Sequence, residues 1–84
     1  MIAVRETRGR KMPDLSAVGR AGVLTVATRG TEGAGEVQVS LRGATETLLA
    51  WSAEPLARGT HVVVVGVVSS RTVRVVRADE VGLG

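Results

Sequence analysis

The sequence predicts an all-β fold, a small five-stranded OB-fold-like barrel that is closed or nearly closed. Two observations lead to this prediction: five short segments rich in β-branched residues follow one another after Gly19, and glycine-containing turns separate them. No stretch has a convincing helical pattern. Closure is expected because open edges on strands this rich in valine would pair with other chains. An SH3-like barrel is the alternative for five strands of this length.

The first two strands are expected at residues 22–28 (GVLTVAT) and 36–41 (EVQVSL). In the first, either alternate set of side chains forms a plausible inward face, so its register stays open. In the second, strict alternation predicts one buried apolar face, made of Val37, Val39 and Leu41. The three glycines of residues 29–35 predict a mobile loop between the strands, and Arg42-Gly43 predicts a tight turn after them.

The third strand is expected at residues 45–52 (TETLLAWS). Its alternation predicts that one set of side chains faces inward, namely Leu48, Ala50 and Ser52. The other set then faces outward, namely Thr47, Leu49 and Trp51. Pro55 and Gly59 indicate a connector after this strand, because proline cannot donate to a ladder and glycine suits a reversal.

The last two strands are expected at residues 61–68 (HVVVVGVV) and 72–77 (TVRVVR). The first of these is the most apolar segment of the chain, and Gly66 within it predicts a bulge or a sharp bend. Alternation in the last strand predicts two faces, Val73 and Val75 against Arg74 and Val76.

The barrel is expected to span residues 19–78, between a flexible basic arm at 1–18 and a frayed tail at 79–84. Four basic residues cluster in the arm around a single glutamate: Arg5, Arg8, Arg10 and Lys11. The arm is expected to be either a solvated terminal segment or a segment that faces an anionic membrane surface. No signal peptide is visible, and the longest apolar run is far shorter than the roughly 20 residues of a membrane helix, so the chain as given is expected to be soluble.

Composition argues against catalysis, cofactor binding and metal binding. The chain of 84 residues has one histidine, His61, and no cysteine, so a metal site with the usual number of ligands is not expected. The serines lack an activating base at useful spacing, and the glycine-rich loop lacks the lysine and the helix of a phosphate-binding loop. We therefore expect no catalytic residue, no metal, no cofactor and no small-molecule substrate. The absence of cysteine fits a reducing compartment.

Trp51 is the only aromatic residue of the chain. OB barrels that bind single-stranded nucleic acid stack bases on several aromatic side chains, so this alternative predicts only weak, non-specific and salt-dependent binding. Its charge would come from five arginines: Arg42, Arg58, Arg71, Arg74 and Arg77. Trp51 itself either lies buried under the connector or the arm, or faces a protein partner together with Leu49. In the second case Arg42 and Arg74 are the expected rim of the partner-binding patch.

Several motifs follow one another in a set order along the barrel. They are a glycine-led first strand, a Gly-x-Val-x-Val second strand, a third strand with a small residue, an apolar-x-x-Gly connector and two Val-x-Val strands. The segments that carry them are Gly19-Arg20-Ala21-Gly22, Gly35-Glu36-Val37-Gln38-Val39, Leu48-Leu49-Ala50-Trp51-Ser52, Leu56-Ala57-Arg58-Gly59, Val62-Val63-Val64-Val65 and Val73-Arg74-Val75. This order, over residues 18–78, resembles the C-terminal soluble domain of the NfeD family.

The resemblance implies an OB-fold barrel without a catalytic role, which usually follows membrane-spanning helices and serves assemblies with stomatin/flotillin-type (SPFH) proteins. Longer relatives carry a ClpP-like serine protease region that is absent here, so no protease residue is carried over. The chain is then either a soluble member or a piece of a longer membrane protein, with membrane contact through the basic arm or through upstream helices. We expect a cytoplasmic location, at the membrane in the second case.

Overall fold

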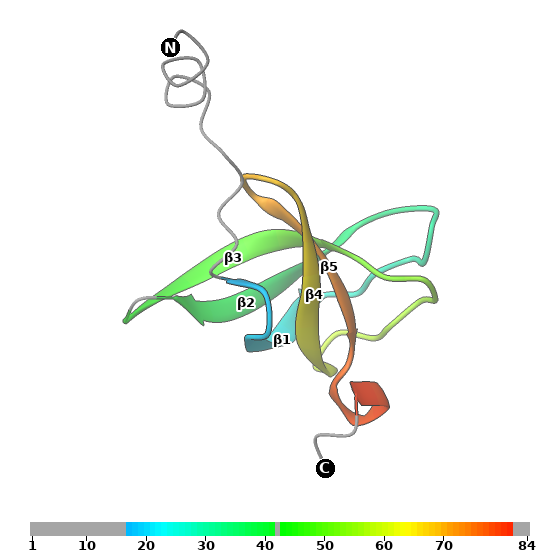
Figure 1. The fold of residues 1–84 in the computed structure, drawn as a ribbon. Helices are drawn as coiled ribbons and strands as arrows, with labels where there is room; N and C mark the ends of the chain where they lie inside the picture. Colours follow the sequence, from blue (N-terminus) through cyan, green and yellow to red (C-terminus); the bar gives the residue numbers. More distant parts are fainter. Residues whose placement is uncertain (1–16, 42, 82–84) are drawn as a thin grey trace, which may run out of the picture.

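A computed structural model describes residues 17–41 and 43–81 of the chain. Five strands form a closed barrel: β1 (Ala21–Val26), β2 (Gly35–Leu41), β3 (Ala44–Trp51), β4 (His61–Ser69) and β5 (Thr72–Arg77). Around the barrel the strand order is β1-β2-β3-β5-β4, and β4 closes the barrel by pairing with β1 (Figure 1). All neighbouring strands are antiparallel except β3 and β5. The predicted five-stranded OB-fold-like barrel is confirmed.

The core of the barrel consists of valine, leucine and alanine side chains. The inward-facing sets predicted for β2, β3 and β5 are all buried: Val37, Val39, Leu41, Leu48, Ala50, Ser52, Val73 and Val75. The apolar members of these sets pack with four further side chains of β1, β4 and the connector, which are Leu24, Val62, Val64 and Leu56. The alternation is strict along β2, whereas in β3 and β5 it holds only for the residues that reach the core, because Ala44, Glu46 and Arg77 lie on the inward-facing sets and are nevertheless exposed.

The register of β1, which the sequence leaves open, is decided by a bulge. Leu24 pairs with Val37 and is 1% exposed, whereas Val26 pairs with Glu36 and is 46% exposed. The register shifts between these two residues, so Thr25 is the extra residue and Val26 turns outward. Neither strictly alternating set of β1 side chains therefore faces the core. The strand also ends at Val26, two residues before the predicted end at residue 28.

The loop between β1 and β2, expected to be mobile, is held by its own backbone. The amide N of Arg29 donates to the carbonyl oxygen of Gly33 at 3.0 Å, and that of Glu32 donates to the carbonyl oxygen of Arg29 at 3.1 Å. Gly30 and Gly33 are buried within this turn. Since these bonds close the segment on itself, the glycines allow a compact turn here rather than a loose one.

Gly66 lies at a register shift between Val64 and the following residues of β4, as predicted. The backbone there does not require glycine, because Gly66 is not among the glycines with positive φ, and a Cβ atom would lie 4.0 Å from the Cβ of Arg74. Positive φ occurs at turns instead, for example at Gly43 (82°) and Gly59 (90°).

The two ends of the barrel differ from the predicted boundaries. Ala17, assigned to the arm, is buried in the core, and the amide N of Gly19 donates to the carbonyl oxygen of Val64 at 2.8 Å. After β5, a short 3₁₀ helix (Ala78–Val81) stands where a frayed tail was expected. The rest of the predicted arm, residues 1–16, and residues 82–84 lie outside the described part of the chain. Within that part, no helix has the length and apolar character needed to cross a membrane.

Candidate functional site

The outer faces of β3, β5 and β4 bring Trp51 and Arg74 side by side. Parallel pairing of β3 with β5 places Trp51 opposite Arg74, and antiparallel pairing of β5 with β4 places Arg74 opposite Gly66. Paired residues share one face of a sheet, so this row runs from an indole ring to a guanidinium group and then to a position without a side chain. Two residues earlier on the same face of β3, Leu49 pairs with Thr72 of β5.

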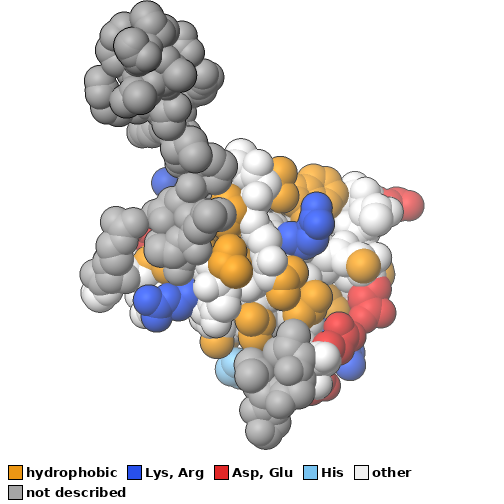
Figure 2. Space-filling view, viewed as in Figure 1, with side chains coloured by type: hydrophobic (Ala, Val, Ile, Leu, Met, Phe, Trp, Pro, Cys, Tyr) orange, Lys and Arg blue, Asp and Glu red, His pale blue; other side chains and the backbone are white. Residues whose placement is uncertain are grey.

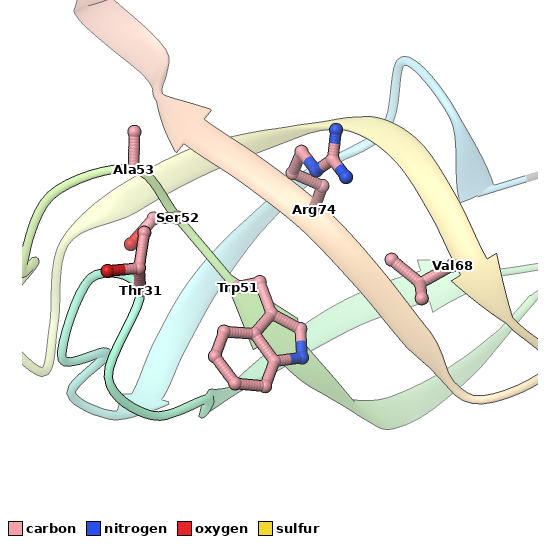
Figure 3. A pocket seen from close by; sticks show the side chains of 6 residues that line it. All are labelled: Thr31, Trp51, Ser52, Ala53, Val68 and Arg74. Carbon is pink, nitrogen blue, oxygen red and sulfur yellow. The ribbon is translucent and has the colours of Figure 1, made fainter.

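A groove of about 620 Å³ opens on this face, and six residues line it: Thr31, Trp51, Ser52, Ala53, Val68 and Arg74. Figure 3 shows that they come from the loop before β2, the end of β3, the start of the β3–β4 connector, the end of β4 and the middle of β5. The walls at Trp51 and Val68 are apolar, and Arg74 is the one lining residue with a charged side chain.

Apolar side chains around the groove are exposed to solvent. Val68 is 53% exposed and Leu49 is 47% exposed, while Trp51 is partly exposed. The prediction that Leu49 and Trp51 face outward is therefore confirmed, and Trp51 lies in the wall of the groove rather than in the core. In the view of Figure 2, apolar and basic side chains lie over β4 and β5, and acidic side chains gather toward one margin. Clustered exposed apolar side chains of this kind are typical of interaction surfaces.

Hydrogen bonds between two buried hydroxyl groups fix one end of the groove. The Oγ1 of Thr28 and the Oγ of Ser52 lie 2.6 Å apart, and the hydroxyl of Ser52 donates to the carbonyl oxygen of Glu54 at 2.7 Å. The amide N of Leu56 donates to the Oγ1 of Thr28 at 2.9 Å. These bonds join the β1–β2 loop to the β3–β4 connector, and so they position Thr31 and Ala53 on the two sides of the groove end.

Arg74 and Arg77, both on β5, differ in the carboxylates that surround them. The Nε of Arg77 lies 3.4 Å from a carboxylate oxygen of Asp79 and 4.0 Å from one of Glu80. Over residues 17–41 and 43–81, by contrast, no carboxylate lies within ion-pair distance of Arg74. The same residues contain no group of three or more histidine, cysteine, aspartate or glutamate side chains that could hold a metal ion. The groove is thus suited to apolar contact and to one charged interaction.

Of the residues predicted for a partner-binding patch, the structure brings Leu49, Trp51 and Arg74 onto one face. Arg42 lies outside the described residues. Val68 is a wall of the groove that the sequence analysis missed. The irregularity at Gly66 was the available signal, because a bulge reverses the alternation and turns the side chains beyond it to the other face. His61 is exposed at the start of β4 and does not line this groove.

Comparison with known proteins gives the family. The NfeD C-terminal domain family matches this chain over residues 21–76, which is more than half of its length. The chain belongs to this family. It is also similar to a solved structure described as the soluble domain of the NfeD protein YuaF from Bacillus subtilis, with 28% sequence identity and a TM-score of 0.60. That likeness covers 92% of this chain and 82% of the other. A search of curated proteins found no match.

The part of the chain that matches the NfeD C-terminal domain coincides with the barrel. It begins at the first residue of β1 and ends one residue before the end of β5. All six residues that line the groove lie within it. The groove is therefore built by the NfeD C-terminal domain itself and not by the segments that flank it.

Proposed function

We propose that this chain is a non-catalytic protein-interaction module that binds a protein partner through its docking surface, which we define as Leu49, Trp51, Val68 and Arg74. The observation that carries the proposal is the exposure of two large aliphatic side chains beside a tryptophan at an open groove. Tryptophan and arginine are the residue types most enriched among those that dominate binding energy at protein interfaces. Arg42, which precedes β3, is proposed as a further contact.

A non-catalytic role is supported by the chemistry of the groove. Its side chains are apolar apart from one guanidinium group and the hydroxyls of Thr31 and Ser52. The hydroxyl of Ser52 is buried and hydrogen-bonded to Thr28 and to the carbonyl oxygen of Glu54, so it is a structural group rather than an activated nucleophile.

We further propose that the partner is a stomatin/flotillin-type (SPFH) protein and that the chain works in a membrane-associated assembly on the cytoplasmic side. Membership of the NfeD C-terminal domain family supports this proposal. So does the basic cluster of residues 5–11, because basic residues near a membrane favour the cytoplasmic side and an anionic leaflet.

The experiment is to immobilise a stomatin/flotillin-type protein from the same source and to measure its affinity for the full chain and for three variants. Trp51→Ala and Leu49→Asp remove contacts of the docking surface, and each is expected to weaken binding at least tenfold. Thr45→Asp is the matched control, since it places the same charge at another exposed position of β3. The affinity of this control is expected to stay within about twofold of the wild-type affinity. Circular dichroism checks that all variants fold.

Equal binding by the wild-type chain and Trp51→Ala would contradict the docking surface, and so would an equal loss in Thr45→Asp. Absence of any binding would contradict the proposed class of partner. The same chain is also titrated with a single-stranded oligonucleotide. Micromolar binding that survives moderate salt would favour a nucleic-acid-binding function instead.

A further inference from the structure

We infer that the docking surface selects an acidic partner segment, one that inserts an apolar side chain between Trp51 and Val68 and places a carboxylate on Arg74. This inference rests on the proposed function and adds the chemistry of the partner. It follows from the shape of the groove, from the surroundings of the guanidinium group and from the charge of the chain.

The groove separates its apolar part from its charged part. In Figure 3 the indole of Trp51 and the guanidinium of Arg74 project in different directions from adjacent strands, so neither covers the other. Val68 projects from β4 on the other side of β5. A bound segment can therefore bury an apolar side chain against the indole and at the same time reach the guanidinium.

The surroundings of Arg74 leave its guanidinium accessible. The side chain is exposed, and Gly66, directly opposite on β4, has no side chain to cover it. Within the described residues, Asp79 and Glu80 pair with Arg77 and not with Arg74. Guanidinium presents several donors in a planar fork that matches the two oxygens of a carboxylate.

The charge of the chain argues against two other occupants of the groove. Residues 1–16 carry four basic and two acidic side chains, a net charge of +2, so this segment would bring like charge to Arg74. A second copy of the chain would do the same, because the whole chain has a formal net charge of +3. Like charges placed together at an interface are unfavourable, whereas an acidic segment is complementary.

The test uses two acetylated, amidated hexapeptides as probes, Ser-Asp-Leu-Leu-Asp-Ser and Ser-Asn-Leu-Leu-Asn-Ser. Neither contains an aromatic residue, and Trp51 is the only aromatic residue of the protein, so its fluorescence reports binding at the groove alone. At low salt the acidic peptide is expected to bind the full chain about fivefold more tightly than the amide peptide, which is the range for an exposed ion pair. This preference is expected to fall toward unity in high salt.

Arg74→Gln is expected to abolish the preference, so that the ratio of the affinities for the acidic and the amide peptide falls from about five to about one. Arg71→Gln, which removes the same charge from the β4–β5 turn, is the matched control and is expected to keep it. Equal binding of the two peptides by the wild-type chain, no binding of either, or a preference that survives Arg74→Gln would overturn the inference. So would an oligo(dT) that binds more tightly than the acidic peptide and depends on Arg74.

The two proposals fail in different ways. If the stomatin/flotillin-type protein binds and Trp51→Ala weakens this binding, but the wild-type chain binds the two peptides equally, only the inferred preference for an acidic segment is wrong. If Trp51→Ala binds that protein as well as the wild-type chain does and the peptides are not distinguished, the docking surface itself is wrong.

Discussion

Replacing Thr28 with valine tests whether the two buried hydroxyls hold the groove end together. Thr28 is 2% exposed, and its Oγ1 accepts a hydrogen bond from the amide N of Leu56 at 2.9 Å. Valine has nearly the same shape and leaves no cavity, so the variant removes the hydroxyl alone. The amide of Leu56 then stays buried without an acceptor, which costs about 1–3 kcal/mol. The bond between Thr28 and Ser52 is lost as well.

We therefore expect the free energy of unfolding to fall by about 2 kcal/mol, within the range for an orphaned buried donor. In a domain of this size, that change lowers the melting temperature by roughly 8–16 °C. Urea titration followed by far-ultraviolet circular dichroism measures the free energy. Trp51 adjoins Ser52, so its fluorescence additionally shows whether the groove end loosens before the barrel unfolds.

Thr45→Val provides the control, because this substitution makes the same chemical change at an exposed position of β3. It is expected to change stability by less than about 0.5 kcal/mol. A loss in Thr28→Val no larger than that of the control would refute the argument. Combining Thr28→Val with Ser52→Ala should cost less than the sum of the single losses, since both break the same 2.6 Å hydrogen bond.

Three further predictions concern the barrel and its surface. Gly22→Ala should destabilise the barrel by about 1–3 kcal/mol in urea titration, because the added Cβ would lie 2.6 Å from the Cγ1 of Val39. Gly66→Ala should be neutral or stabilising by up to about 1 kcal/mol. A loss of stability in Gly66→Ala larger than that in Gly22→Ala would contradict the geometry. Iodide should quench the fluorescence of Trp51 more strongly than caesium does, because the positive charge of Arg74 beside the groove attracts the anion and repels the cation. Arg74→Gln should reduce this difference between the two Stern–Volmer constants. An unchanged difference in the variant would place the guanidinium away from the ring. Arg77→Gln should change the free energy of unfolding by less than about 0.5 kcal/mol despite the pair at 3.4 Å, because both side chains are largely exposed; a loss above 1 kcal/mol would show a stronger network.

The five strands, their order along the chain and most of their inward faces could be predicted because alternation with a period of two is a local property. β2 follows it over its whole length, β3 and β5 follow it where they reach the core, and the buried apolar residues of all three strands are those that the pattern predicts. The inward face of β1 could not be assigned from the sequence, because the bulge at Thr25 depends on how β1 pairs with β2 and with β4. The compact β1–β2 loop was missed for a similar reason, since glycine is compatible with both a loose and a tight turn.

Half of the candidate site was contained in the sequence, and half arose only on folding. Alternation along β3 predicted that Leu49 and Trp51 share the outward face, and composition made Trp51 the only aromatic side chain of the chain, but whether Trp51 is covered stayed open. The tertiary structure decided which groups stand beside them. The parallel pairing of β3 with β5 joins segments separated by the whole of β4, and it sets Arg74 next to Trp51. Two register shifts in β4, between Val64 and Gly66 and between Val67 and Ser69, then place Val68 in the wall of the same groove, because an extra residue in a strand changes the face on which the neighbouring side chains lie.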